Sequence, residues 1–260
     1  MISINVDTSG LLRLRAEIEG KGKQVRLAAA RALTSAAFKA SKDVAARMAQ
    51  VFDRPTPWVL KSVRYTRARK DKLESTVDFD FWGNKQGVTV AHVLRAEIFG
   101  GQRKLKRHEI ALQRAGILPP GHAIVPGPAA KLDQYGNISG GQIVQIMAWF
   151  KSFGEVGYKA NMTDKTRKRL GKDKRNGTRG FQYFALFKKH GKLYPGIYQR
   201  FDLGFGSAVK PVMHFVPIPK YRRRLDFYGL AEKSARAEFA AAFSRELAAQ
   251  RQYSAISGGA

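Results

Sequence analysis

Asp78 and Asp80 are the acidic residues whose spacing comes closest to a metal-dependent active site. Two positions apart in a strand, they project to the same face, where their carboxylates could hold Mg²⁺ as in a nuclease. Such a site also needs a third acidic ligand and a lysine. Glu97 and Lys85 are available, but nothing in the spacing selects them. An exposed polar face on an edge strand explains the pair more simply, and a nuclease stays as an alternative.

The five histidines are scattered along the chain and form no metal-binding pattern. None is paired with another at the i, i+4 spacing with which a helix presents two ligands to zinc. His108 precedes Glu109 at the start of a predicted helix, where a glutamate complements the partial positive charge of the helix N-terminus. We expect structural or surface roles for all five: His92, His108, His122, His190 and His214.

Glycine-containing motifs of known enzymes are incomplete in this chain. Gly-Gly-Gln, which carries catalysis in peptide-release factors, occurs at 100–102 and 140–142, but 25 glycines in 260 residues make chance repeats ordinary. The segment 20–23 has the wrong spacing for a phosphate-binding loop, and 204–207 lacks the order of a nucleophile elbow. There is no cysteine to supply a thiolate. The sequence therefore predicts a protein that is not an enzyme and has no catalytic residues, bound metal or cofactor.

Positive charge is the strongest chemical feature of the sequence. The chain has 47 lysines and arginines against 20 acidic residues, a formal net charge of +27. Such a surface repels copies of itself and attracts polyanions, whether nucleic acid, acidic protein or lipid headgroups. Hydrophobic residues make up 44% of the chain, so a folded core accompanies this charge. No secretion signal or membrane-spanning apolar run is apparent, so we expect a soluble protein made in the cytoplasm.

The densest basic segment is 154–180, where nine lysines and arginines accompany three acidic residues, Glu155, Asp164 and Asp173. One interpretation is a flexible arm, 159–179, that folds onto a polyanion through backbone charge and reads no base sequence. The other is a solvated loop, or a loop ordered by neighbouring subunits. A second basic cluster lies at 221–224. The residues that we expect to contact a polyanion or a partner are Lys165, Arg167, Lys168, Arg169, Lys172, Lys174, Arg175, Arg222 and Arg223.

Hydrophobic periodicity predicts two long helices, at 24–52 and 224–250. The chain between them is predicted to form short helices at 57–63, 92–99, 106–115 and 142–153, and strands at 62–69, 75–81, 88–91, 181–188, 196–201 and 212–219. A Pro- and Gly-rich excursion at 118–141 precedes the basic segment. This order favours an α+β fold in which the two long helices pack an antiparallel sheet. We expect one domain over 1–260, with 100–180 as an insertion or extended arm.

Several stretches of the chain resemble a family of bacteriophage proteins. The Ala-rich helix 24–52 runs into Phe-Asp-Arg-Pro-Thr-Pro-Trp at 52–58, Leu-Asp-Gln-Tyr-Gly-Asn-Ile-Ser lies at 132–139, and Tyr-Pro-Gly-Ile-Tyr-Gln-Arg at 194–200 precedes a strand and a terminal helix. Together they are similar to the minor tail protein Z and tail-completion proteins of tailed phages and prophages. The residues that we assign to the shared motifs are Arg54, Pro55, Pro57, Gly196, Tyr198 and Arg200.

The resemblance implies structural work without catalysis. Proteins of this kind finish the head-proximal end of the tail so that it joins the DNA-filled head, and their neck modules commonly form rings around the DNA channel. It implies a homo-oligomer in the virion, with tail and neck proteins and the DNA backbone as partners, and with no membrane or small-molecule substrate. The 100–180 segment has no counterpart in the compact tail-completion modules. The alternative is a sequence-nonspecific nucleic-acid-binding protein that acts through its basic surface and the 159–179 arm.

Overall fold

The computed structural model describes residues 22–79, 89–154, 160–173, 175, 177 and 179–257. The chain divides into two compact units. The first unit combines the part of the chain up to Gly101 with the part from Arg222 onward, and the second comprises Gln102–Tyr221. Each unit has its own cluster of buried apolar side chains.

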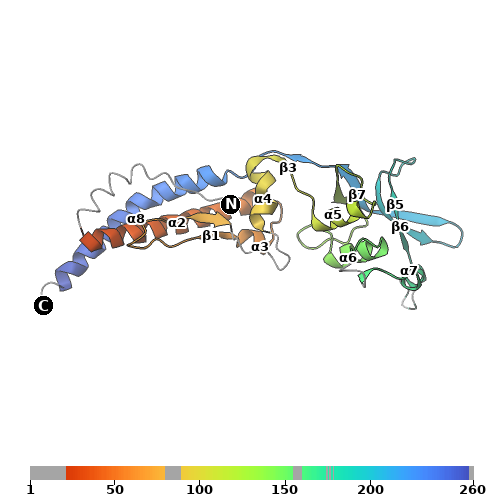
Figure 1. The fold of residues 1–260 in the computed structure, drawn as a ribbon, viewed down its shortest axis with the longest axis horizontal. Helices are drawn as coiled ribbons and strands as arrows, with labels where there is room; N and C mark the ends of the chain where they lie inside the picture. Colours follow the sequence, from red (N-terminus) through yellow and green to blue (C-terminus); the bar gives the residue numbers. More distant parts are fainter. Residues whose placement is uncertain are drawn as a thin grey trace. The chain divides into compact units, whose positions relative to one another are not determined.

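Two long helices, α2 (Gly22–Val51) and α8 (Phe227–Ser257), lie side by side in the first unit (Figure 1). Arg31 of α2 pairs with Glu246 of α8, and Asp43 accepts a hydrogen bond from Ser234, so the helices run antiparallel. Small side chains allow the close approach of the two helices. The buried alanines of α2 include Ala29, Ala32, Ala36 and Ala40.

The remaining elements of the first unit are short. They are α3 (Pro57–Leu60), β1 (Val63–Tyr65), β2 (Val77–Phe79) and α4 (Val90–Phe99). Strands β1 and β2 pair antiparallel, and backbone hydrogen bonds from Thr66 to Thr76 and from Arg69 to Lys72 continue this pairing to its tip. We call residues 63–79 the ribbon. In the core of the unit, Phe79 of the ribbon stacks on Phe227 of α8, with 4.6 Å between the ring centroids.

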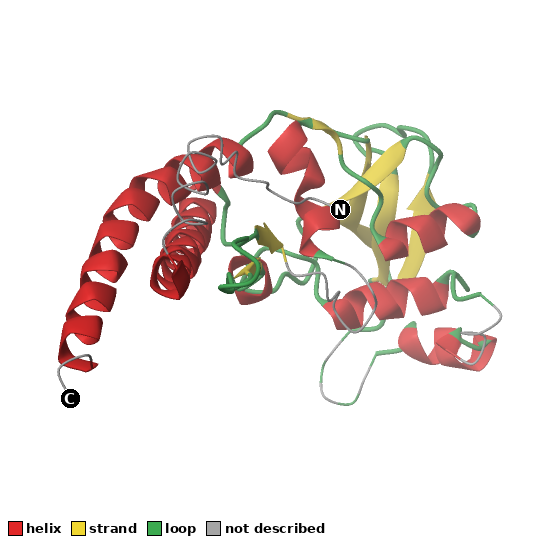
Figure 2. Ribbon diagram, turned by 60° about the vertical axis from the view of Figure 1, so that its left-hand side comes forward, coloured by secondary structure: helices red, strands yellow, loops and turns green. Residues whose placement is uncertain are grey.

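The second unit contains a four-stranded antiparallel sheet in the order β4-β7-β6-β5 (Figure 2). Its strands are β4 (His122–Pro126), β5 (Gln182–Leu186), β6 (Gly196–Asp202) and β7 (Ser207–Pro217). Helices α5 (Arg107–Arg114) and α6 (Gly140–Trp149) bury Leu112 and Ile146 against one face of the sheet, beside Ile197 and Met213. The unit also has the short helix α7 (Asp164–Leu170), and the strands β3 (Gly101–Gln102) and β8 (Lys220–Tyr221) pair at its limits.

The structure confirms the α+β class, the antiparallel pairing and the two long helices. The long helices pack together and against the ribbon, while the four-stranded sheet belongs to the second unit. We expected one domain with an insertion at 100–180, but the second unit extends to Tyr221 because β6 and β7 pair with strands on both sides of them.

Three local predictions were wrong. Val90 and Ala91 begin helix α4, capped by Thr89, where we expected a strand over 88–91; residue 88 lies outside the described residues. The excursion 118–141 contains strand β4, which pairs with β7. The basic segment contains α7, because Thr163 caps that helix by accepting a hydrogen bond from the Thr166 amide.

Candidate functional site

The structure buries the one described member of the acidic pair Asp78 and Asp80. Asp78 lies in β2 with only 6% of its surface exposed, so it does not sit on an exposed edge as we expected. Its Oδ1 accepts a hydrogen bond from the Phe79 amide at 2.7 Å, and its Oδ2 has no partner among the described residues. Burial raises the pKa of this carboxyl above its usual value. Asp80 and Lys85 lie outside the described residues.

The third carboxylate of that hypothetical metal site is engaged elsewhere. Glu97 of α4 accepts two hydrogen bonds from the Arg224 guanidinium, at 2.7 and 2.9 Å. Within the described part of the chain, no group of three histidine, aspartate or glutamate side chains could hold a metal ion. The site therefore offers Mg²⁺ one buried carboxyl group and no described second ligand.

Glu109 is a buried acidic residue whose carboxylate accepts four hydrogen bonds. Its side chain is fully buried at the start of α5, where the Arg103 guanidinium donates to both of its oxygens at 2.6 and 2.7 Å. The backbone amides of Lys106 and Ile124 donate to the same carboxylate. Burial alone would raise the pKa of Glu109, but these hydrogen bonds outweigh it and lower that pKa. This carboxylate therefore joins α5 to β4 and has no lone pair directed at a substrate.

The histidines have no shared site. Burial lowers the pKa of His108 to about 4, so its ring is neutral at pH 7. His122 shares a hydrogen bond with the Pro120 carbonyl, while His92 and His190 are exposed on different units. The two Gly-Gly-Gln tripeptides are structural, since one ends α4 and the other begins α6, where the buried Gln142 accepts from the Lys131 amide.

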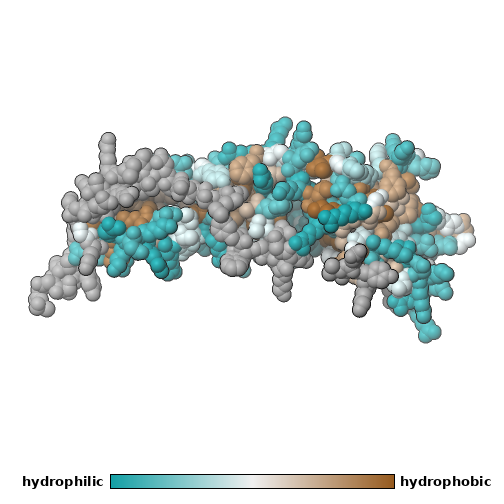
Figure 3. Space-filling model, in the orientation of Figure 1, coloured by the Kyte–Doolittle hydropathy of each residue, from teal (hydrophilic) through white to brown (hydrophobic). Residues whose placement is uncertain are grey.

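Helix α7 carries four of the nine predicted basic contact residues, and Lys172 follows it closely. The side chains of Lys165, Lys168, Arg169 and Lys172 are exposed and form no ion pair with any described residue. In Figure 3 hydrophilic side chains gather over this end of the second unit. Arg175 is exposed in the loop that follows, and Lys174 lies outside the described residues. We call the four exposed side chains of Lys165, Lys168, Arg169 and Lys172 the α7 cluster.

Arg167 differs from its neighbours because it is half-buried. Its guanidinium lies over the Trp149 ring, with 5.4 Å from Cζ to the ring centroid, and donates to the Trp149 carbonyl. It therefore fixes α7 against α6 and holds the α7 cluster in place. The segment after α7 is also anchored, because Asp173 accepts from the Gly180 amide and Leu170 from the Phe181 amide. This part of the predicted arm is a helix attached to the unit.

The second predicted basic cluster belongs to the first unit. Arg222 and Arg223 are exposed, and Arg223 pairs with Asp226 at the start of α8. Arg224 is committed to Glu97 and also lies over the Phe52 ring, 5.8 Å from its centroid. The predicted contact residues are thus divided between two compact units.

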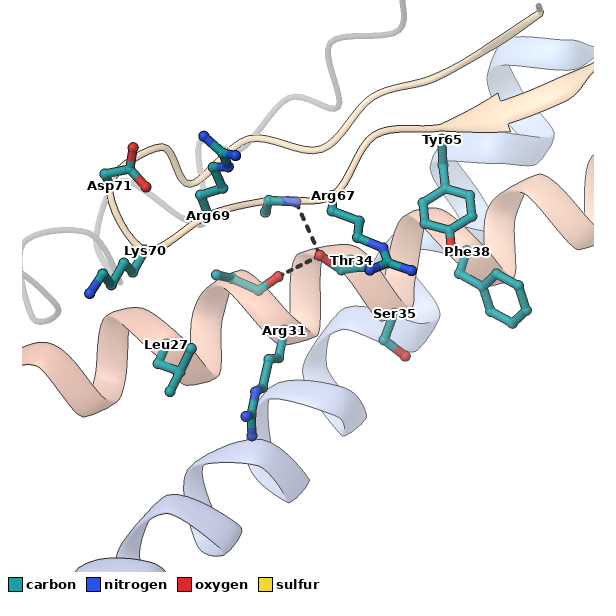
Figure 4. Close-up of a pocket in the computed structure, with 12 residues that line it drawn as sticks. Leu27, Arg31, Thr34, Ser35, Phe38, Tyr65, Arg67, Arg69, Lys70 and Asp71 are labelled. Carbon is teal, nitrogen blue, oxygen red and sulfur yellow. Dashed lines mark hydrogen bonds between the residues drawn. The ribbon is translucent and has the colours of Figure 1, made fainter.

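A further basic surface, which sequence reasoning missed, lies between α2 and the ribbon (Figure 4). Here Thr34 of α2 accepts a hydrogen bond from the Ala68 amide at 3.1 Å and donates to the Ala30 carbonyl at 2.9 Å. Arg26 donates to the Lys70 carbonyl at 2.9 Å, which attaches the tip of the ribbon to the same helix. Helix and ribbon border an open hollow of about 760 Å³, and a second hollow of about 510 Å³ adjoins it.

The two hollows share Phe38, Tyr65 and Arg67 and both lie along α2; together we call them the ribbon groove. Phe38 is 46% exposed and meets Tyr65 edge to face. The floor is apolar, with Leu27 and alanines of α2. One aspartate, Asp71, and seven basic side chains line the groove; the basic ones are Arg31, Lys42, Lys61, Arg64, Arg67, Arg69 and Lys70.

The residues of the phage-like motifs build the structure. Pro57 occupies the first turn of α3, capped by Thr56, while Pro55 precedes that cap and Arg54, with φ 46°, pairs with Asp53. In β6, a Cβ added to Gly196 would lie 2.2 Å from the Met213 carbonyl oxygen, so only glycine fits there.

Two further motif residues pack against Phe184 of β5. Tyr198 is 1% exposed and stacks on the Phe184 ring, and its hydroxyl donates to the Tyr194 carbonyl at 2.7 Å. Arg200 lies over the same ring, with 4.9 Å from Cζ to its centroid. These two residues therefore join β5 to β6, and neither borders the ribbon groove.

Comparisons of the chain with protein-family models, with curated proteins and with solved structures gave no significant match. Among the described helices, none combines the length and the hydropathy that crossing a lipid bilayer requires.

Proposed function

We propose that this chain is a structural, non-catalytic protein of a tailed bacteriophage or prophage. It completes the head-proximal end of the tail, helps to join the tail to the head, and acts as a homo-oligomer among other tail and neck proteins. The stretches at 52–58, 132–139 and 194–200 that resemble minor tail protein Z support this proposal.

One structural observation carries the proposal: most described carboxylates already form ion pairs with nearby lysines or arginines. The excess cations therefore remain on the surface. Each of ten described carboxylates forms an ion pair within its own unit. Because basic residues outnumber acidic ones by 47 to 20, the remaining cations have few acids to pair with. A surface of this kind suits a component that packs between DNA and acidic neighbours.

The arrangement of these cations supports contact without sequence reading. Three members of the α7 cluster lie on a seven-residue helix and Lys172 just follows it. This helix can present charge to a phosphate backbone, but it is too short to fill a major groove. The described carboxylates and histidines gather around no shared cavity. Binding and positioning, rather than turnover, are therefore the activities that the described surfaces favour.

Deletion of the gene from a phage or prophage that encodes the chain tests the proposal. We expect electron micrographs of induced lysates to show heads and tails that are not joined, or tails with an abnormal head-proximal end. Expression of the chain from a plasmid should restore joined particles. Normal yields of infectious particles from the deletion strain would overturn the proposal.

A second candidate function is sequence-nonspecific binding of nucleic acid by the protein in solution. The exposed α7 cluster favours it, because those four side chains have no ion pair among the described residues. This function predicts that the purified chain binds unrelated duplexes equally and that its affinity falls steeply with salt. If the deletion strain assembles normally while the purified chain binds DNA in this way, the second candidate replaces the first.

A further inference from the structure

The ribbon groove has a floor whose polar groups are already satisfied. The Thr34 hydroxyl is bonded on both sides, Ser35 donates to Glu238 at 3.2 Å, and Ser41 donates to the Phe38 carbonyl at 2.7 Å. A ligand in the groove therefore meets apolar surface at the floor, from Leu27, alanines and Phe38. Only apolar groups on the ligand gain free energy by covering that surface.

The rim of the groove is cationic. Arg67, Arg69 and Lys70 extend from the ribbon with exposed side chains, and none of them forms an ion pair with a described residue. Asp71 is the one acidic residue that lines the groove. The groove thus selects a ligand that combines negative charge with apolar side chains.

Nucleic acid satisfies only half of that requirement. Single strands are held by bases that stack on open aromatic faces, but Lys42 lies over the Phe38 ring, 5.4 Å from its centroid, and Tyr65 contacts the same ring. Duplex DNA presents phosphates and has no apolar group that reaches a hollow of this size. An extended protein segment supplies both carboxylates and apolar side chains at alternate positions.

A second copy of the chain is a poor occupant. Most of its described carboxylates are committed to local ion pairs, and its net charge of +27 opposes approach of another copy to a cationic groove.

We infer that the ribbon groove docks an acidic, apolar segment of a different protein, with its apolar side chains between Leu27 and Phe38 and its carboxylates against Arg67, Arg69 and Lys70. The inference deepens the proposed function, because it gives the chemistry of one neighbour that a structural virion protein would contact. Its test uses the purified chain and a peptide, so the result does not depend on particle assembly.

The probe is a fluorescent synthetic peptide in which Glu alternates with Leu and Phe. One control peptide has Gln in place of each Glu, and the other has Ser in place of each Leu and Phe. We expect fluorescence anisotropy to show binding of the probe to the full chain. The affinity for each control peptide should be lower by about tenfold or more. Equal binding of the probe and the Ser-containing control would overturn the inference, because the apolar floor would then have no role.

Two variants with the same change in charge locate the binding. Arg67→Ser/Arg69→Ser/Lys70→Ser removes three cations from the groove, and Lys165→Ser/Lys168→Ser/Lys172→Ser removes three from the α7 cluster. We expect the groove variant to lose about tenfold or more in peptide affinity, and the α7 variant to stay within about twofold of the unmodified chain. Equal losses in both variants would mean general attraction to a basic protein and would overturn the inference.

Phe38→Ser and Phe38→Leu separate the apolar contact from the charge. We expect Phe38→Ser to weaken the probe several-fold while Phe38→Leu keeps most of the affinity, with circular dichroism showing both variants folded. An unchanged affinity in a folded Phe38→Ser variant would exclude the groove. If a single-stranded oligonucleotide displaces the probe from the unmodified chain and fails to bind the groove variant, nucleic acid is the occupant and the inference is overturned. Dimers that dissociate in the groove variant would make a second copy the occupant.

Discussion

The cations of the ribbon groove surround an apolar hollow, whereas those of the α7 cluster lie exposed on a seven-residue helix and just after its end. In the groove Arg67 has Phe38 and Tyr65 beside it. At α7 the aromatic contact belongs to Arg167, which is half-buried, and the exposed cations of the cluster lie over no aromatic ring of the described residues. Two positively charged surfaces therefore suit different partners: the groove favours a protein segment that fills it, and the cluster favours a phosphate backbone that needs no shaped site.

The two units also treat a buried carboxyl group differently. In the second unit Glu109 receives four hydrogen bonds and its pKa is lowered in spite of burial. In the first unit Asp78 receives one described hydrogen bond and burial raises its pKa. The first arrangement joins elements of the fold, while the second leaves a buried charge that costs stability.

The largest effect should follow from Glu109→Ala in the second unit. It leaves the Arg103 guanidinium and two backbone amides without their acceptor, so we expect the free energy of unfolding to fall by about 3–5 kcal/mol. Urea unfolding measures this loss of stability. Amide hydrogen exchange over residues 103–126 shows whether the loss lies around Glu109.

The matched control is Glu97→Ala in the first unit, which breaks a bidentate pair with the more exposed Arg224. We expect a loss of about 1 kcal/mol or less, because the Arg224 side chain that loses its partner is half-exposed and water can solvate it. Similar losses for both variants would show that burial of Glu109 does not set its importance.

The next effect concerns the α7 cluster. In Lys165→Ser/Lys168→Ser/Arg169→Ser/Lys172→Ser, four potential phosphate contacts are removed. We expect duplex affinity at moderate salt to fall at least tenfold, and the slope of log affinity against log salt to become less negative by about 3–4. Filter binding over a series of salt concentrations measures both quantities.

The groove variant Arg67→Ser/Arg69→Ser/Lys70→Ser is the control for this prediction. It changes net charge by a similar amount, but we expect the duplex slope to change by about 1 or less, because the groove holds no phosphate backbone. If it changes the slope as much as the α7 variant does, the two surfaces bind the same kind of partner.

The residue pattern predicted the long helices because their apolar residues recur at helical spacing for many turns. The short helices and strands were harder to predict from the sequence. Strand β4 lies among prolines and glycines and forms because β7, about 90 residues later in the chain, pairs with it. Helix α7 has no apolar stripe of its own and depends on the Thr163 cap and on Arg167 against Trp149. Such tertiary contacts leave little trace in local composition.

The candidate sites also depend on tertiary contacts that local sequence does not reveal. The basic character of 163–175 was visible, yet the sequence could not show that Arg167 turns inward. The groove was missed, although a third basic run marks the ribbon, with Arg64, Arg67, Arg69, Lys70 and Lys72 close together. Its hollow lies between α2 and the ribbon, which come together through contacts such as that of Thr34 with the Ala68 amide, more than 30 residues later in the chain.

A smaller effect should follow from Thr34→Val, which tests how the groove is held. Valine keeps the shape of threonine but removes the hydroxyl that links Ala68 of the ribbon to α2. We expect the free energy of unfolding to fall by about 1 kcal/mol, and the acidic peptide to bind a few-fold more weakly. Thr34→Ser, which keeps the hydroxyl, should retain both properties more closely. Unchanged peptide affinity in Thr34→Val would show that the ribbon position does not shape the groove.

The smallest effect should come from Asp78→Asn, and its sign depends on pH. Because burial raises the folded pKa of Asp78 above the usual 3.8, its neutral form stabilises the fold at low pH, and that contribution is lost as pH rises through the folded pKa. Asparagine keeps an acceptor for the Phe79 amide and carries no charge. We therefore expect Asp78→Asn to be more stable than the unmodified chain by up to about 1 kcal/mol at pH 7, with the difference vanishing below the pKa of the unfolded chain.

Glu109→Gln should give the opposite curve. The folded pKa of Glu109 lies below the usual 4.5, so its contribution is present above that value and is lost as pH falls through the folded pKa. Urea unfolding of both variants from pH 3 to pH 7 measures the two curves. Relative to the unmodified chain, Asp78→Asn should become more stable as pH rises, and Glu109→Gln should become less stable. If Asp78→Asn is instead the less stable protein at pH 7, the Asp78 carboxylate gains more from a cation than it loses by burial, and the contrast between the two units fails.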